Sequence, residues 1–322
     1  EISRSDWSSD VCSSDLQESH IFSPCKYSDF YTYLERNRED VLEEMGQYYY
    51  VDSDSELWSD FERGLEEGIC YDSLADIIYE NTPNFASDEF RDADWYNAQI
   101  YIEEECDNLL DCIRSGFEEW INSLELDTIT KKYEIDKTAR FFTFNYTEVL
   151  EKIYEIPAEN VFHIHKRVGE ELIFGHGKDV EKFNVKKALY GDENAHLIID
   201  EEMGDVVTTE DGHEEFAESA VCAFYDKMRK HTDEIIKEYL DQFHKLSDVD
   251  EVIVIGHSYN EIDLPYFKKI SESINNRATW TLYYFSESDR ASAENLMAEM
   301  HIGSNLLRYN SCLGNTVINL NQ

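Results

Sequence analysis

Residues 251–267 read EVIVIGHSYNEIDLPYF and decide the fold class. Four consecutive β-branched residues, Val252 to Ile255, are too few for an isolated helix and predict a strand buried on both faces. Gly256 ends this strand, and an amphipathic stretch that runs to about Ile274 predicts a helix. A strand, a turn and a helix in this order place a ligand site at the carboxyl end of the strand.

Two further strands lie upstream. Residues 140–150, RFFTFNYTEVL, contain an aromatic strand that stops at Asn145, after which Thr147 is placed to cap a helix. Residues 160–165, NVFHIH, predict another strand. Because short strands alternate with helices here, we predict an α/β fold in which these strands and residues 252–255 share one mainly parallel, Rossmann-like sheet.

A large helical portion precedes the strands. Residues 27–122 predict helices, and one long apolar stripe comprises Ile102, Cys106, Leu109, Ile113, Phe117, Trp120 and Leu124. We expect residues 17–138 to form a helical region and residues 139–322 to form an α/β, nucleotide-binding-like region, together making one composite domain.

Three more elements are expected after residue 190. The acidic, glycine-containing residues 190–215 predict a solvated loop or lid. A helix should follow it, with one face formed by Phe224, Met228, Ile235 and Tyr239. Residues 279–285 predict another strand, and Ser286 is placed to cap the helix behind it.

Charge narrows the range of partners. The chain carries 70 acidic and 28 basic residues, a formal net charge of −42, which repels phosphate backbones and anionic lipid headgroups. We therefore expect no broad nucleic-acid interface and no membrane association. A nucleotide is still compatible with this charge, because backbone amides at one helix N-terminus are enough to bind a phosphate locally.

Cysteine usage and hydropathy point to the cytoplasm. The seven cysteines contain no Cys-x-x-Cys pair and no zinc-ribbon spacing, so they predict reduced thiols. No apolar run approaches the roughly 18 to 20 residues that a membrane span needs. We expect a cytoplasmic protein.

Three blocks of sequence carry a family resemblance. They are FNYTEVLEKIY at 144–154, VFHIH at 161–165 with FGHG at 174–177, and VIVIGHSYNEIDLPYF at 252–267. Together they resemble the AbiH family of bacterial phage abortive-infection proteins, over roughly residue 26 to the C-terminus. The resemblance implies a role in phage defence, a phage or host protein as trigger, and self-association as one option.

The first residues do not fit this resemblance. Residues 6–16, DWSSDVCSSDL, look like the translation of a sequencing adapter, so we expect residues 1–16 to be foreign and to add nothing to stability. Proteins of the family typically open with a strand and a Gly-Asn-Gly-Phe-Asp type turn. Only the segment expected after that turn, Lys26 to Phe30, is found here.

AbiH proteins are in turn distantly similar to sirtuin-like NAD-binding domains, and this implies a site. By position, Asn145 with Thr143 matches a Thr-x-Asn turn, His165 a His-Gly turn, and Gly256 with Ser258 a Gly-Ser turn. The resemblance implies that His165 acts as a base toward the nicotinamide ribose and that Asn145 orients water or ribose. An imidazole suits that role at neutral pH. Further contacts to NAD or a related nucleotide are expected from Tyr146, His176 and His257.

One position departs from the sirtuin-like pattern. Lys166 stands where the His-Gly turn would have its glycine, so a backbone position suited to positive φ bears a side chain.

Each candidate residue also has a structural reading. Asn145 is equally compatible with a turn or cap role, and His165 with a hydrogen-bonded core histidine. His163, between Phe162 and Ile164, favours a core role, whereas His176 between two glycines suits either a ligand contact or a turn. Asp263 favours a charge at a helix start over an acid catalyst.

Three classes of function remain open. The first is a sirtuin-like enzyme that binds NAD and, in its intact form with the glycine-rich turn, hydrolyses it on infection. The second is a non-catalytic sensor or partner-binding protein. The third is a metal-dependent hydrolase in which Zn or Mn would be held by His163, His165, His176 and Asp263. In the leading interpretation no residue is assigned to a metal.

Overall fold

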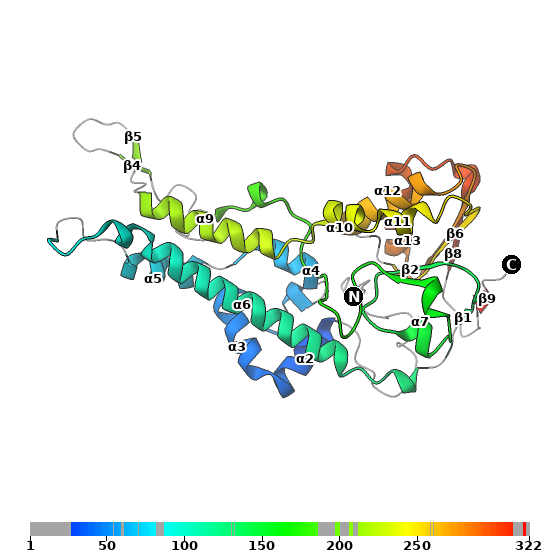
Figure 1. Ribbon diagram of the computed structural model, residues 1–322, viewed down its shortest axis with the longest axis horizontal. Helices are drawn as coiled ribbons and strands as arrows, with labels where there is room; N and C mark the ends of the chain where they lie inside the picture. Colours follow the sequence, from blue (N-terminus) through cyan, green and yellow to red (C-terminus); the bar gives the residue numbers. More distant parts are fainter. Residues whose placement is uncertain are drawn as a thin grey trace.

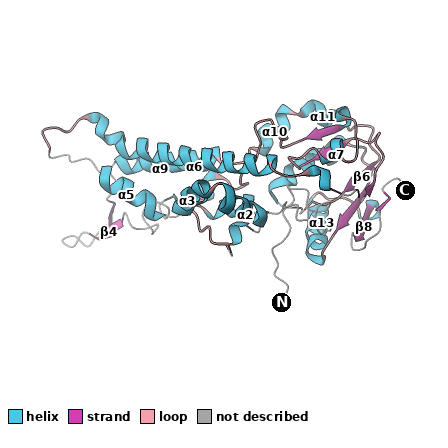
Figure 2. Ribbon diagram, turned by 90° about the horizontal axis from the view of Figure 1, so that it is seen from below, coloured by secondary structure: helices cyan, strands magenta, loops and turns pink. Residues whose placement is uncertain are grey.

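The computed structural model describes residues 27–53, 55–58, 61–69, 71–81, 87–129, 131, 133–185, 197–199, 206–208, 212–257, 259, 261–311 and 318–319. Residues 1–16 and Ser258 lie outside this part of the chain. The described residues form an elongated molecule with two unlike ends, a helical arm and a strand-containing head (Figure 1). The same two ends are seen in the perpendicular view (Figure 2).

The helical arm is built on two long helices that lie side by side, α6 (Asn97–Asn122) and α9 (Gly212–Lys227) (Figure 1). Shorter helices pack around them: α2 (Tyr27–Asn37), α3 (Glu39–Tyr48), α4 (Phe61–Gly64) and α5 (Tyr71–Asn81). The arm therefore contains helices from both sides of residue 138, where we predicted a boundary between two regions. That boundary stays a prediction.

Apolar periodicity explains α6. Six members of the predicted stripe, from Ile102 to Trp120, are buried, and the seventh, Leu124, lies just past the helix end. Aromatic rings close the interior around Phe30, whose centroid lies 5.1 Å from that of Trp120 and 5.6 Å from that of Phe117. The predicted packing face is confirmed.

The head contains the parallel strands. In one sheet β2 (Phe141–Thr143) pairs with β3 (Val161–His163), and in another β6 (Glu251–Val254), β7 (Thr279–Tyr284) and β8 (Leu307–Ser311) pair in that order. Both sheets are parallel, as is the pair of β1 (Tyr133–Glu134) with β9 (Ile318–Asn319). The helices of the head are α7 (Val149–Lys152), α10 (Thr232–Glu238), α11 (Leu240–His244), α12 (Leu264–Ser273) and α13 (Glu287–Glu299).

Short 3-10 turns complete the described elements. They span Glu56–Trp58, Leu65–Glu67, Asp92–Tyr96, Leu126–Thr128, Ala158–Asn160, Val180–Lys182, Glu261–Asp263 (η7) and Ser304–Leu306.

Within the described residues the parallel strands are found as predicted, but they fall into separate small sheets rather than the single Rossmann-like sheet that we expected. The strands before Phe144 and Ile164 belong to the two-stranded sheet, and Ile253 belongs to the three-stranded one. Bulky side chains at the strand ends, including Phe144 and Phe162, pack in one hydrophobic cluster with Val254. The two sheets therefore meet through side chains rather than through a shared hydrogen-bond ladder.

Three local expectations need correction. The strand at 251–254 is half-buried rather than buried on both faces. Within residues 190–215, β4 (Leu197–Ile199) and β5 (Val206–Thr208) pair antiparallel, so the expected loop contains a β-ladder. The helix expected from Phe224 to Tyr239 is interrupted between α9 and α10, because the backbone of His176 bonds to Met228 and Lys230 there.

Of the two predicted helix caps, the structure shows one. Ser286 caps α13 through its side chain, as predicted. Thr147 does not occupy the cap of α7, whose N-cap residue is Glu148. Among the described helices, none is long and apolar enough to cross a membrane.

Candidate functional site

The predicted site residues begin where parallel strands end. His165 follows β3 and His257 follows β6, while Asp263 closes the turn that leads into α12. The register pairs Thr143 with His163, so Asn145 and His165 both lie two residues beyond the end of the ladder. The ends of parallel strands bring together residues that are far apart in the sequence.

Tight turns make this arrangement. Gly256 has φ +68°, in the left-handed region that glycine adopts without cost. Lys166 has φ +63° and Tyr259 has φ +58°, two positions at which a side chain makes that conformation unfavourable. The positive φ that the sequence suggested at Lys166 is confirmed. Strained positions of this kind gather at functional sites.

A buried polar cluster lies behind these turns. The Asp263 carboxylate lies 3.3 Å from Nε2 of His257, 3.8 Å from Nε2 of His165 and 3.9 Å from Nζ of Lys230. Lys230 in turn donates to Oε2 of Glu62 at 2.8 Å. All five side chains are buried, and those of His165 and Asp263 are 0% exposed.

The members of this cluster come from both ends of the molecule. Glu62 lies on α4 of the arm, and its other oxygen accepts a hydrogen bond from the Gly175 amide at 3.1 Å. Lys230 lies between α9 and α10, where the arm meets the head. The cluster therefore ties α4 to the strand ends.

Aromatic rings surround the two histidines. The ring of Phe144 lies 4.6 Å from that of His257 and 5.4 Å from that of His165, measured between centroids. Tyr266 lies 5.5 Å from His165. These apolar faces exclude water, which strengthens electrostatic interactions among the enclosed groups.

Hydrogen bonding assigns the tautomer of His257. Its Nδ1 accepts from the backbone N–H of Tyr259 at 2.7 Å, so in the neutral ring the proton lies on Nε2. That nitrogen is the one facing Asp263. His257 is thus oriented as a donor toward the carboxylate.

Asn145 and Tyr146 are placed differently. The Asn145 carbonyl accepts from Nδ1 of His163 at 2.9 Å, and the Asn145 side chain is half-buried. Tyr146 is fully buried, its hydroxyl donates to the carbonyl of Ile173, and its ring lies 6.1 Å from that of His165. Those are the contacts of a core residue, and a cofactor contact from Tyr146 stays a prediction.

His163 and His176 bond to groups outside the cluster. The Nε2 atom of His163 lies 2.9 Å from Glu151, which suits the structural role favoured from the sequence. Nε2 of His176 donates to the Tyr225 carbonyl at 3.0 Å, and burial lowers the pKa of His176 to about 4. The four residues of the metal alternative are thus not brought together, and no three His, Cys, Asp or Glu side chains in the described ranges are arranged to hold a metal ion.

The comparison with protein families decides the assignment. A family model described as bacteriophage abortive infection AbiH matches residues 20–284. The chain belongs to the AbiH family. No curated protein and no solved structure matches it.

The sequence did not predict two residues of the polar cluster in this AbiH chain. Glu62 and Lys230 carry no motif, and both lie outside the blocks that indicated the family. The sequence offers no local signal for either residue, because the burial of Lys230 is known only from the structure. Of the residues that the sequence did single out, the structure brings His165, His257 and Asp263 together; Ser258 lies outside the described residues.

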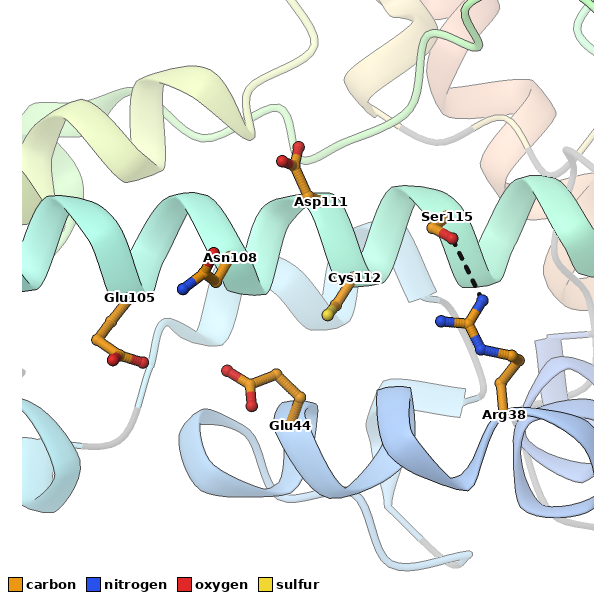
Figure 3. Close-up of a pocket in the computed structure, with 7 residues that line it drawn as sticks. All are labelled: Arg38, Glu44, Glu105, Asn108, Asp111, Cys112 and Ser115. Carbon is orange, nitrogen blue, oxygen red and sulfur yellow. Dashed lines mark hydrogen bonds between the residues drawn. The ribbon is translucent and has the colours of Figure 1, made fainter.

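The AbiH chain also has a surface hollow, which lies on the arm rather than at this cluster. It measures about 440 Å³ and opens between α3 and α6 (Figure 3). Its lining is Arg38, Glu44, Glu105, Asn108, Asp111, Cys112 and Ser115. Arg38 is already bound to Ser115, Glu119 and Asp40. None of the predicted site residues that the structure describes lines this hollow.

Proposed function

We propose that this AbiH chain acts in phage defence as an enzyme that cleaves NAD or a related nucleotide, with His165 as the base. Membership in the family supports the defence role. The observation that carries the enzymatic part is the convergence of His165 and His257 on Asp263, at the carboxyl ends of strands from two parallel sheets.

The chemistry available to this cluster is proton transfer. A neutral imidazole takes a proton near pH 7, and a nearby carboxylate stabilises the imidazolium that results. His165 has such a carboxylate within 3.8 Å. In the proposed reaction His165 accepts a proton from a ribose hydroxyl, and Asn145, two residues past the end of β2, orients the ribose or the attacking water.

Burial sets a condition on this mechanism. Because His165 and Asp263 have no exposed surface, substrate reaches them only if the surrounding aromatic side chains, such as Phe144 and Tyr266, move. Side-chain motion of this kind lets a nucleotide bind the resting protein, while its cleavage awaits infection. A phage or host protein that shifts the arm relative to the head would be a suitable trigger.

The proposal is tested by one substitution and its control. His165→Ala should abolish phage protection and reduce NAD cleavage by roughly 10²- to 10⁴-fold, the usual effect of removing a positioned base. Protection is scored by plaque counts, and NAD and nicotinamide are measured in infected cells and with purified protein. His244→Ala is the matched control, because His244 is exposed at the end of α11.

Full protection by a well-folded His165→Ala chain would rule out the catalytic proposal. If His165→Ala loses protection while NAD cleavage is unchanged, the site is functional but NAD is not its substrate.

A second function, partner binding without catalysis, is favoured by the surface of the arm. Tyr79 on α5 is 83% exposed, and Ile100 and Tyr101 on α6 are 54% and 50% exposed. Exposed aromatic side chains are enriched at protein interfaces. Under this alternative, substitutions at Tyr79 or Tyr101 would abolish protection, while His165→Ala would leave it intact.

A further inference from the structure

The two buried carboxylates of the polar cluster are bonded very differently. Both oxygens of Glu62 accept hydrogen bonds, one from the Gly175 amide and one from Lys230. Neither oxygen of Asp263 accepts a hydrogen bond from any residue that the structure describes. Its three neighbours lie at 3.3 to 3.9 Å, within ion-pair range but without hydrogen-bond geometry.

Helix capping does not account for Asp263. The residue occupies the N-cap of α12, yet its side chain makes no capping hydrogen bond, and its backbone is helical with φ −95° and ψ −6°. The carboxylate is turned toward His257 instead. A charge at a helix start, the interpretation favoured from the sequence, therefore does not explain why this side chain is buried.

The donor next to the Asp263 carboxylate, Nε2–H of His257, is also without a hydrogen bond among the described residues. Nε2 of His257 carries the proton in the neutral ring but makes no hydrogen bond within the described residues. A buried acceptor and a buried donor thus lie next to each other without bonding. Leaving such groups unsatisfied is unfavourable, and proteins that keep them usually do so for a ligand, a catalytic step or an ordered water.

We propose that Asp263 and His257 form a hydroxyl-binding subsite for the ribose of a nucleotide. A carboxylate accepts hydrogen bonds from two neighbouring hydroxyl groups, as acidic side chains do in dinucleotide-binding folds. Nε2–H of His257 donates to a hydroxyl oxygen of the same sugar. The subsite deepens the proposed function and rests on it, since it lies beside His165.

Stability gives the first test. Asp263→Asn keeps the shape and removes a buried charge that accepts no hydrogen bond, while Lys230 keeps its hydrogen bond to Glu62, so the urea midpoint of unfolding should stay equal or rise. Glu62→Gln is the matched control from the same cluster, and it should lower the midpoint because it weakens two existing bonds. If Asp263→Asn lowers the midpoint as much as Glu62→Gln does, Asp263 is structural and the subsite is overturned.

Ligand binding gives the second test. The probes are NAD, ATP and ribose 5-phosphate, with 2-deoxyribose 5-phosphate as the sugar control, and binding is measured as the rise in unfolding temperature. Ribose-bearing probes should stabilise the wild type and bind Asp263→Asn about 10- to 100-fold more weakly, the value of hydrogen bonds to a charged group. Deoxyribose 5-phosphate should stabilise the wild type less than ribose 5-phosphate does.

The outcomes separate the two proposals. Equal binding by wild type and Asp263→Asn, or no stabilisation of the wild type by any ribose probe, overturns the subsite and leaves an ordered structural water as the partner of Asp263. Stabilisation by ATP or ribose 5-phosphate but not by NAD supports the subsite and contradicts NAD as the substrate.

Discussion

The arm and the strand ends of the head bury different kinds of side chain. In the arm, rings such as Phe30, Phe117 and Trp120 pack against one another in an apolar interior. At the strand ends, the enclosed groups are ionisable, with Lys230 and Asp263 fully buried. Apolar burial stabilises a fold directly, whereas buried ionisable groups are costly unless every one is paired.

This difference teaches where stability and function lie. The arm has an apolar interior that needs no ligand to explain it. The polar cluster carries unmet hydrogen bonds, which fold stability alone does not explain. The following predictions test this contrast, from the largest expected change in stability to the smallest.

Lys230→Met should have the largest effect. It removes the cation bound to Glu62, which then stays buried with the Gly175 amide as a remaining donor. Breaking a buried ion pair by removing one partner typically costs about 3 to 5 kcal/mol of unfolding free energy. Urea denaturation followed by circular dichroism measures it.

The control is the double variant Glu62→Gln with Lys230→Met, which leaves no charge of the pair behind. Its loss should be smaller than the sum of the two single losses. An ordinary mutation changes the free energy of unfolding by roughly 1 kcal/mol. If Lys230→Met lowers it by no more than that, the proposed contrast between the arm and the polar cluster is wrong.

The second largest change in stability should come from the titration of His176 with pH. Burial, the largest cause, lowers the pKa of His176 to about 4, against about 6.5 in an unfolded chain. Between these values the unfolded state binds the extra proton, so this contribution is present above about pH 6.5 and is lost as the pH falls to about 4. The full loss is about 3 kcal/mol.

Urea midpoints at pH 7, 6 and 5 measure this loss. His176→Gln keeps a donor for the Tyr225 carbonyl but does not titrate. The difference in stability between wild type and His176→Gln should therefore shift with pH in favour of the variant as the solution is acidified. Parallel curves for the two chains would show that the imidazole is not held neutral by burial.

Ile113→Val should have a modest effect in the arm. Ile113 is fully buried on α6, and the loss of one methylene costs about 0.5 to 1.5 kcal/mol in a well-packed core. Phage protection should be unchanged, because the substitution touches no member of the polar cluster. Thermal unfolding together with plaque counts tests both statements, and lost protection in this variant would place function in the arm.

Tyr101→Ala should have the smallest effect on stability. The side chain is half-exposed on α6, so the unfolding free energy should change by no more than about 0.5 kcal/mol. Plaque counts then decide between the two proposed functions. Unchanged protection favours the enzymatic site, and lost protection in a chain of normal stability favours a partner that docks on the arm.

Local sequence patterns anticipated much of the fold. The stripe on α6, the strand-turn-helix unit around Gly256 and the cap at Ser286 follow from periodicity and capping chemistry, which act over a few residues. The division into two sheets did not follow, because strand pairing depends on which side chains fill the space between them. Here Phe144 and Phe162 pack in the same hydrophobic cluster as Val254.

The candidate site divides in the same way. The sequence by itself determined the family, the parallel strands and the prominence of His165, His257 and Asp263, because motif spacing and residue chemistry are readable along the chain. Only the tertiary structure decided that Glu62 and Lys230 join them and that His163 and His176 do not. The physical reason is that a side chain's burial and bonding partners come from segments distant in sequence, and no local pattern encodes those distances.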